Sequence, residues 1–178
     1  MELTLEQWFA ELDQYHDRIP LTVLTRGLKQ VRVDLEAVQS FVQFSPERYR
    51  RNLMHAGPVY HALVLCWRNG QQSPIHDHRA SSCAVRVIHG EATETVFEMT
   101  EEGNVFPLRT RKLSEGFMCA TQDLDIHQIS NLQPGDADLI TLHIYSPPLL
   151  VMGQYSLTDT VVREFNDEVY VFAQGAGI

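Results

Sequence analysis

The sequence predicts a mainly β domain, a β-barrel with a small helical layer at its N-terminal end. Apolar residues recur at helical spacing over about the first fifty positions, and after Gly57-Pro58 short apolar stretches alternate with turn signals. The chain has 178 residues, about the length of one domain. We therefore expect a single domain over residues 1–178, with 1–55 mostly helical and 56–178 forming the barrel.

Three helices are expected in the N-terminal layer. The first begins after Thr4, which stands three residues before Gln7 in the spacing of a capping box. Pro20 suits the start of the second helix, and the third runs from about Asp34 to Phe41, followed by a short turn at Ser45. One apolar face per helix supports these bounds: Leu5, Trp8, Phe9, Leu12 and Tyr15; Leu21, Leu24 and Leu28; Leu35, Val38 and Phe41.

Short apolar stretches make up the rest of the chain. Glycine, asparagine and proline separate them, as between the strands of an antiparallel sandwich or barrel. No internal repeat or long linker divides this region, so we assign all of it to one β structure. The expected strands are 60–67, 83–88, 92–99, 105–108, 117–120, 139–145 and 161–165.

Composition and charge exclude several classes of function. The net charge is −9, with 14 basic against 23 acidic residues, so a broad phosphate-binding surface for nucleic acid is not expected. Three cysteines without CxxC spacing fit a reducing compartment better than a disulfide framework. No apolar run is long enough to span a membrane, and no signal-peptide pattern occurs at Met1–Ala10. These observations predict a cytoplasmic protein that binds neither nucleic acid nor membrane, and we expect a monomer.

The segment Ile75-His76-Asp77-His78 is the densest chemical signal. If it forms a strand, its two histidines point to the same face and can reach one metal ion. His127 is a third candidate ligand, because a barrel interior brings distant strands together. The alternative, that the histidine pair is incidental surface polarity, is the better interpretation of the pair alone.

The residues flanking the pair change this interpretation. Gly70, His76, His78 and Gly90 stand at the spacing of the first cupin motif, with Cys83 where the motif has glutamate, and His127 with Asn131 resembles the end of the second motif. The region from Tyr49 to Pro148 resembles cysteine dioxygenase, the thiol dioxygenase branch of the cupins. The segments that carry this resemblance are Tyr49-Arg50-Arg51-Asn52-Leu53, Cys66-Trp67, Ile75-His76-Asp77-His78, Cys83 and Leu142-His143-Ile144-Tyr145-Ser146-Pro147-Pro148.

The resemblance implies a role for each matching residue. The fold would be a cupin (jelly-roll) barrel, and His76, His78 and His127 would bind one Fe(II) per chain. Arg51 and Tyr49 would bind the substrate, with the planar guanidinium suited to a carboxylate. Tyr145 would contact substrate or oxygen, and His143 would orient it. Thr141, a serine in the family, keeps the hydroxyl beside His143, and the Ser146-Pro147-Pro148 turn holds a cis bond in the family.

Alternatives remain for three of these residues. Without the family match, Arg51 is best interpreted as a solvated charge at a helix end, and Tyr145 as a half-buried barrel aromatic. Cys83 has three further interpretations. It would be a fourth ligand in a closed, zinc-like site, or a free cysteine packed as a small apolar residue beside an unlinked Tyr145. As in family members with cysteine at this position, it would alternatively form a thioether cross-link with Tyr145 and contribute to catalysis.

The implied activity is iron-dependent oxidation of L-cysteine by O2 to cysteine sulfinic acid. The nearer alternative is a mercaptopropionate dioxygenase, although those relatives carry glutamine where this chain has Arg51. The more distant alternative is a non-catalytic cupin that binds metal. Four histidines match no motif and are expected at the surface or the edge of the core: His16, His55, His61 and His89. Cys66 and Cys119 are expected as small apolar residues in strands, and Trp8 and Phe9 as helix core.

Overall fold

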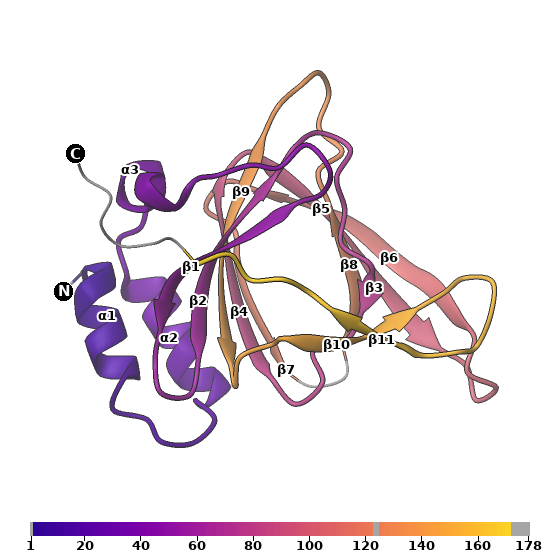
Figure 1. Cartoon of the computed structure of the whole chain (residues 1–178), viewed down its shortest axis with the longest axis horizontal. Coiled ribbons are helices and arrows are strands. Elements are labelled where there is room, and N and C mark those ends of the chain that lie inside the picture. The colour runs from indigo at the N-terminus through magenta and orange to yellow at the C-terminus, as the bar shows by residue number, and fades with distance from the viewer. Residues whose placement is uncertain (1, 123–124, 172–178) are drawn as a thin grey trace.

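Short helices cover the outer face of one of two facing β-sheets in the computed structural model, which describes residues 2–122 and 125–171 (Figure 1). Helix α1 (Leu5–Leu12) has the expected capping box, in which Thr4 Oγ1 accepts from the Gln7 N–H and the Gln7 side chain accepts from the Thr4 N–H. Helix α2 (Leu21–Gln30) follows Pro20, and Asp34 caps α3 (Leu35–Val38), which leads into the 3-10 helix η1 (Gln39–Phe41). Where a short turn was expected at Ser45, the chain forms a bend over residues 46–48.

The strands form two antiparallel sheets. The first has the order β1-β2-β9-β4-β7 and the second the order β11-β10-β3-β8-β5-β6. The bounds are β1 Arg50–Ala56, β2 His61–Trp67, β3 Ile75–His76, β4 Ser82–His89, β5 Glu91–Met99, β6 Val105–Ser114, β7 Met118–Gln122, β8 Ile126–Ser130, β9 Leu139–Ser146, β10 Val151–Tyr155 and β11 Arg163–Asn166.

The structure corrects the expected boundary between helices and barrel. Residues Arg50–Ala56 were expected to belong mostly to the helical layer, but they form strand β1, which pairs antiparallel with β2. The apolar strand β2 pairs with β9 on one side and β1 on the other, so tertiary pairing overrides the mixed local pattern of β1. Strands β3, β8 and β10 were also not expected as such, and β6 continues to Ser114 because it pairs with β5 along its length.

The central strand β9 is buried on both faces. Its side chains alternate between the core under the helices and the space between the two sheets. Ile140, Leu142 and Ile144 pack with the helices in one core cluster. The intervening residues Thr141, His143 and Tyr145 turn towards the space between the sheets. Buried side chains of α1 and α2 complete the outer cluster, so the helical layer covers the sheet and leaves the inner face of β9 to the site: Trp8, Leu12, Leu24 and Leu28.

Two sequence features have clear backbone roles. Gly90 has φ of +83°, and a Cβ there would lie 2.6 Å from the Asp138 carbonyl oxygen, so the second glycine of the first motif is required by the turn. The Ser146–Pro147 peptide bond is cis, as the resemblance implied.

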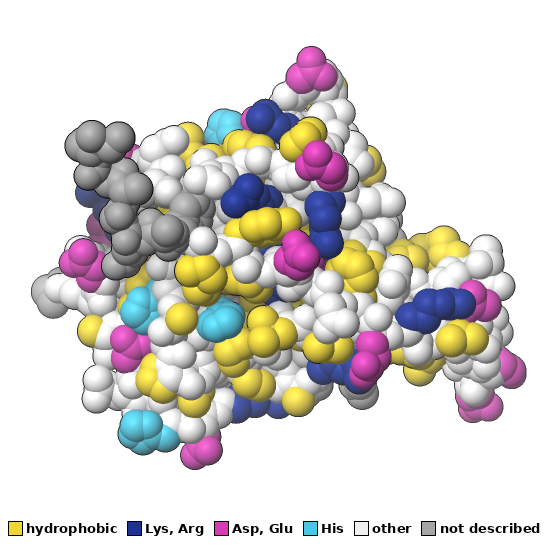
Figure 2. Space-filling view, in the orientation of Figure 1, with side chains coloured by type: hydrophobic (Ala, Val, Ile, Leu, Met, Phe, Trp, Pro, Cys, Tyr) yellow, Lys and Arg dark blue, Asp and Glu magenta, His cyan; other side chains and the backbone are white. Residues whose placement is uncertain are grey.

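The surface carries charges of both signs. On the face shown in Figure 2, Lys and Arg side chains are interspersed with Asp and Glu, and neither kind forms a broad patch. Among the described residues, no helix has the length and apolar character needed to cross a membrane.

Candidate metal centre and the pocket around it

Three buried histidines converge between the sheets. The side-chain nitrogens of His76, His78 and His127 that face one another all lie within 4.8 Å, a spacing suited to one metal ion. His76 on β3 stands directly opposite His127 on β8. Contrary to expectation, His78 lies beyond the end of β3, in a bend where Asp77 accepts from the Gly153 N–H at 3.0 Å and the Arg79 N–H at 3.1 Å. The bend, rather than strand alternation, therefore brings His78 to the other two.

The donor set fits a metal. Both ring nitrogens of His78 are buried without a hydrogen-bond partner, although buried polar atoms normally have one. His76 Nδ1 lies 3.0 Å from the Pro74 carbonyl oxygen, which fixes the proton on Nδ1 and leaves Nε2 as a free electron-pair donor. His127 Nδ1 lies 3.2 Å from Glu94 Oε1, an arrangement common around metal-binding histidines.

Glu94 is a site residue that the sequence did not reveal. It lies on β5, is buried, and accepts from Arg111 Nε at 2.6 Å through its other carboxylate oxygen. Burial alone would raise the pKa of Glu94, but the hydrogen bonds to His127 and Arg111 outweigh it and lower the pKa. A period-two pattern with Ala92 was the available signal, since both side chains are buried on the same face of an expected strand.

Burial keeps the imidazoles of His76 and His78 neutral. Desolvation, followed by the neighbouring His127, lowers the pKa of His76 to about 3, and the same two causes lower the pKa of His78 well below its usual range. A neutral imidazole offers its electron pair to a metal, so near neutral pH these side chains are in the form that binds one.

A hydrogen-bonded relay leads from β2 to the pocket. Trp67 Nε1 donates to Thr141 Oγ1 at 3.1 Å, and Thr141 Oγ1 lies 2.9 Å from His143 Nε2. His143 Nδ1 in turn lies 2.8 Å from the Tyr145 hydroxyl. Tyr145 is buried rather than half-buried, with 4% of its surface exposed. This burial, followed by the nearby Cys83, raises its pKa well above the usual range. The threonine hydroxyl thus makes the contact expected of the family's serine.

Cys83 lies directly beside Tyr145. The two residues are register partners on β4 and β9, and both are buried. Burial, followed by Cys119, raises the pKa of the Cys83 thiol well above its usual range, while a hydrogen bond with Tyr145 acts in the opposite direction. Among the described residues, the cluster that can hold a metal consists of the three histidines without Cys83, so the fourth-ligand interpretation has no support.

Arg51 is buried in the pocket wall and is not a solvated helix-end charge. It lies on β1 with 2% of its surface exposed, and its guanidinium lies 5.6 Å from the centre of the Tyr145 ring. Arg51 Nη1 donates to the Asp167 carbonyl oxygen at 2.9 Å and Nη2 to the Leu149 carbonyl oxygen at 2.7 Å. Tyr49, also buried, donates to the Asp167 carboxylate.

These side chains enclose a cavity of about 20 Å³, which has room for about one water molecule. It brings together most of the residues singled out in the sequence and adds Asp167, which was not expected. The lining residues are Tyr49, Arg51, Leu65, Trp67, Ser73, His76, His127, Ile129, His143, Tyr145, Met152 and Asp167.

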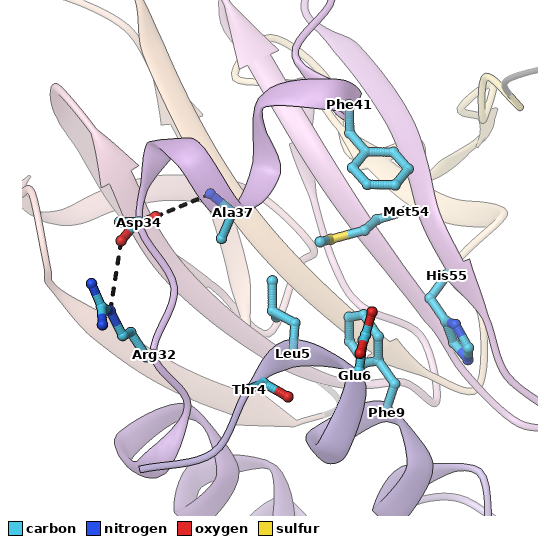
Figure 3. A pocket seen from close by; sticks show the side chains of 10 residues that line it. All are labelled: Thr4, Leu5, Glu6, Phe9, Arg32, Asp34, Ala37, Phe41, Met54 and His55. Atoms are coloured by element: carbon cyan, nitrogen blue, oxygen red, sulfur yellow. Dashed lines mark hydrogen bonds and ion pairs between the residues drawn. The ribbon is translucent and has the colours of Figure 1, made fainter. Parts of the chain in front are cut away.

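A larger groove of about 600 Å³ lies elsewhere, between α1, the α3–η1 segment and β1 (Figure 3). Its lining includes Phe9, Phe41 and Met54 and none of the three convergent histidines. His55, at one end of the groove, contacts the Asp13 carboxylate at 3.0 Å and stacks on Phe9, so it has a structural role.

Comparison with known proteins places the chain in a family. Residues 24–158 match the model of the family described as cysteine dioxygenase type I, and this range includes every segment that carried the resemblance. The chain belongs to the cysteine dioxygenase type I family. The recognition made from the sequence motifs is thereby confirmed.

Relatives in this family align with most of the chain. Cysteine dioxygenase type 1 of Rattus norvegicus is 29% identical over 133 residues, which are 68% of this chain and 66% of the rat protein. The chain thus spans just under two thirds of that relative. Cysteine dioxygenase type 1 of Danio rerio is 32% identical over 153 residues, or 82% of this chain and 75% of that protein.

Solved structures agree on the fold. A Klebsiella pneumoniae protein with a double-stranded β-helix domain superposes with a TM-score of 0.52 at 17% identity, covering 67% of this chain and 94% of that one. The expected cupin barrel with a small N-terminal helical layer is confirmed. The family resemblance predicted the cupin topology, and the pattern of short apolar stretches predicted that the domain is mainly β.

Proposed function

We propose that this protein is a thiol dioxygenase that oxidises L-cysteine with O2 to cysteine sulfinic acid, using one Fe(II) per chain. One observation carries the proposal: three buried histidines converge beside a Tyr145–His143 relay and a buried arginine. A site that only bound metal would need no such relay or arginine. Family membership supports the same chemistry.

The ligand set suits an anionic substrate sulfur. Three neutral imidazoles do not reduce the charge of a divalent ion and leave coordination positions open. A bound Fe(II) would supply a binding position for the thiolate sulfur and the electrons needed to activate O2. Both oxygen atoms of O2 are incorporated into the product, and the thiol sulfur is oxidised to the sulfinic acid, so no external reductant is required.

In this proposal Tyr145 is the hydrogen-bond donor of the pocket. Trp67 Nε1 can only donate, so Thr141 accepts from it and has its own proton available for His143 Nε2. His143 then carries its proton on Nδ1 and donates it to the Tyr145 oxygen. The Tyr145 O–H, which otherwise hydrogen-bonds with Cys83, can then donate to substrate or oxygen, and its raised pKa keeps that proton in place.

Arg51 would hold the substrate carboxylate, with Tyr49 beside it. Two of its five N–H groups bind backbone carbonyls, and the remaining N–H groups can donate to a carboxylate. This arrangement favours a thiol with a carboxylate, as in L-cysteine or mercaptopropionate, over one without it.

The proposed function also includes a covalent bond between Cys83 and Tyr145. The two side chains lie opposite each other on neighbouring strands, at the separation where cross-strand pairs make contact. Joining sulfur to the ring carbon breaks one S–H and one ring C–H bond and releases two protons and two electrons. O2 would accept all four and leave as hydrogen peroxide. The bond would fix the ring and keep the Tyr145 hydroxyl aimed at the pocket.

Oxygen uptake by the iron-loaded protein tests the function. We expect uptake with L-cysteine to exceed uptake with mercaptopropionate and cysteamine, and a sulfinic acid product carrying two labelled atoms from 18O2. His78→Ala is the control, since it should lose both iron and uptake. Full iron loading with no uptake for any of the three thiols would favour the non-catalytic cupin instead. The cytoplasmic location and monomeric state expected from the sequence stay predictions.

A further inference from the structure

A carboxylate of the protein itself, that of Asp167, lies beside Arg51 in the pocket. Asp167 follows β11, is 5% exposed, and lines the same small cavity as Arg51, His76 and His127. Its backbone is held at both ends of the residue: the N–H donates to the Leu150 carbonyl at 3.2 Å, and the carbonyl accepts from Arg51. The Asp167 side chain is therefore a fixed part of the pocket wall.

Three donors surround this carboxylate. One oxygen, Oδ2, accepts from the Tyr49 hydroxyl and lies 3.5 Å from Arg51 Nη1. The other, Oδ1, accepts from Arg48 Nη2. Arg48 is partly exposed, and its guanidinium lies over the ring of Tyr49. Asp167 thus pairs with Arg51 inside the pocket and with Arg48 at its edge. The contact to Arg51 is the longest of the three.

This geometry opposes the binding of a substrate carboxylate. The cavity has room for about one water molecule, so a carboxylate that reaches Arg51 must lie close to Asp167. Two like charges in a buried site repel strongly, because little water is present to screen them. A thiol that has an amine and no carboxylate does not meet this repulsion.

We propose that Asp167 is a specificity-determining residue, which competes with the substrate carboxylate for Arg51, and that Arg48 moderates the competition by holding Asp167 from the other side. The inference rests on the proposed function and deepens it, since it concerns which thiols the same pocket prefers. It predicts that the ratio of activity with cysteamine to activity with L-cysteine is higher than it would be in a pocket that had Arg51 but no Asp167.

The test compares the parent with Asp167→Asn and Arg48→Gln, each loaded with Fe(II). Calorimetric titration without O2 gives the Kd of L-cysteine and of cysteamine, and O2 uptake gives KM and kcat. Asp167→Asn should tighten L-cysteine binding and lower its KM about tenfold, while the Kd and KM of cysteamine should change much less than those of L-cysteine. Asp159→Asn is the matched control, because it removes the same charge from an exposed arginine pair and should change nothing.

Arg48→Gln should act in the opposite direction. Asp167 then has Arg51 as its remaining arginine partner, so L-cysteine should bind about threefold more weakly while cysteamine is unaffected. In the Asp167→Asn background the same change should have no effect, because Arg48 is proposed to act through Asp167.

The outcomes separate this inference from the proposed function. Equal shifts for both thiols in Asp167→Asn, or none, would overturn the specificity role, as would an Arg48→Gln effect that persists in the double variant. Absence of O2 uptake in the parent would reject the proposed function, and the anaerobic Kd values would still decide the competition at Arg51. If Asp167→Asn does not fold, Arg48→Gln tests the inference alone. Weaker binding of L-cysteine with unchanged binding of cysteamine would support it, and any other result would overturn it.

Discussion

At the scale of single residues, Glu94 joins the candidate metal centre to the β5–β6 hairpin. Its two carboxylate oxygens contact His127 and Arg111, so it fixes which ring nitrogen of His127 carries the proton. We predict that Glu94→Gln weakens metal binding about 10- to 100-fold, because partners of this kind orient the ligand and raise its basicity.

Competition with a chelator measures this loss of affinity. Glu91→Gln is the matched control, since Glu91 lies on the same strand and pairs with the exposed Lys112. Unchanged metal affinity in Glu94→Gln would mean that the carboxylate only neutralises Arg111.

The proposed cross-link predicts a change in mass. After turnover with iron and L-cysteine, a fraction of the protein should be lighter by about two hydrogen masses, because one C–S bond replaces S–H and ring C–H. Cys83→Ser and Tyr145→Phe should not show the change. Peptide mapping that finds free Cys83 after many turnovers would reject the cross-link and leave the dioxygenase proposal standing.

Site residues could be recognised from the sequence when they stand together in short motifs. His76 and His78 stand together, and Arg51, His143 and Tyr145 lie in short segments that resemble the family, so they were recognised without coordinates. Asp167 has no such signal, and Glu94 has only the period-two pattern that it shares with Ala92. Glu94 meets His127 from 33 residues away, and Asp167 meets Arg51 from 116 residues away, so only the folded chain brings them together.

At the scale of elements, strands with a continuous apolar run were predictable and strands with mixed polarity were not. Strand β2 is almost entirely buried, and its pattern is plain in the sequence. Strand β1 has a mixed burial pattern and is identified by its pairing with β2. Strand β3 has two residues, and its partners are β8 and β10. Short strands at a site depend on long-range pairing, which periodicity does not report.

The junction between β10 and the bend after β3 gives an element-scale prediction. A Cβ at Gly153 would lie 2.5 Å from Asp77 Oδ2, and Asp77 holds the bend that carries His78. Gly153→Ala should therefore cost about 1–3 kcal/mol in the free energy of unfolding and also reduce metal retention.

Thermal denaturation and metal content after dialysis measure the two effects. The control is Gly27→Ala, whose Cβ would clash with Trp8 in the helical layer, away from the bend. It should lower stability and leave metal retention unchanged. If both variants retain metal equally, the β10 contact does not position His78.

At the scale of the whole molecule, two apolar clusters carry the fold without the metal. One lies between the helices and the first sheet, and the other between the two sheets, where it includes Leu63, Leu139 and Tyr145. A domain of this size buries enough surface to fold without a structural ion. The metal then adds stability only through its affinity for the folded state.

The three histidines should contribute differently to the free energy of unfolding of the metal-free protein. His78 has two buried nitrogens without partners, so in the metal-free protein its polar groups lower stability. His78→Leu should raise the free energy of unfolding of the metal-free protein by roughly 1 kcal/mol or more while abolishing the stabilisation that added Fe(II) gives the parent. His127→Leu leaves Glu94 without its histidine, and His76→Leu removes one of the two donors to the Pro74 carbonyl, so both should lower stability. Urea denaturation with and without Fe(II) measures all four proteins. If His78→Leu destabilises the metal-free protein as much as the other two variants, His78 belongs to the structural core, and its unpartnered nitrogens do not mark a metal ligand.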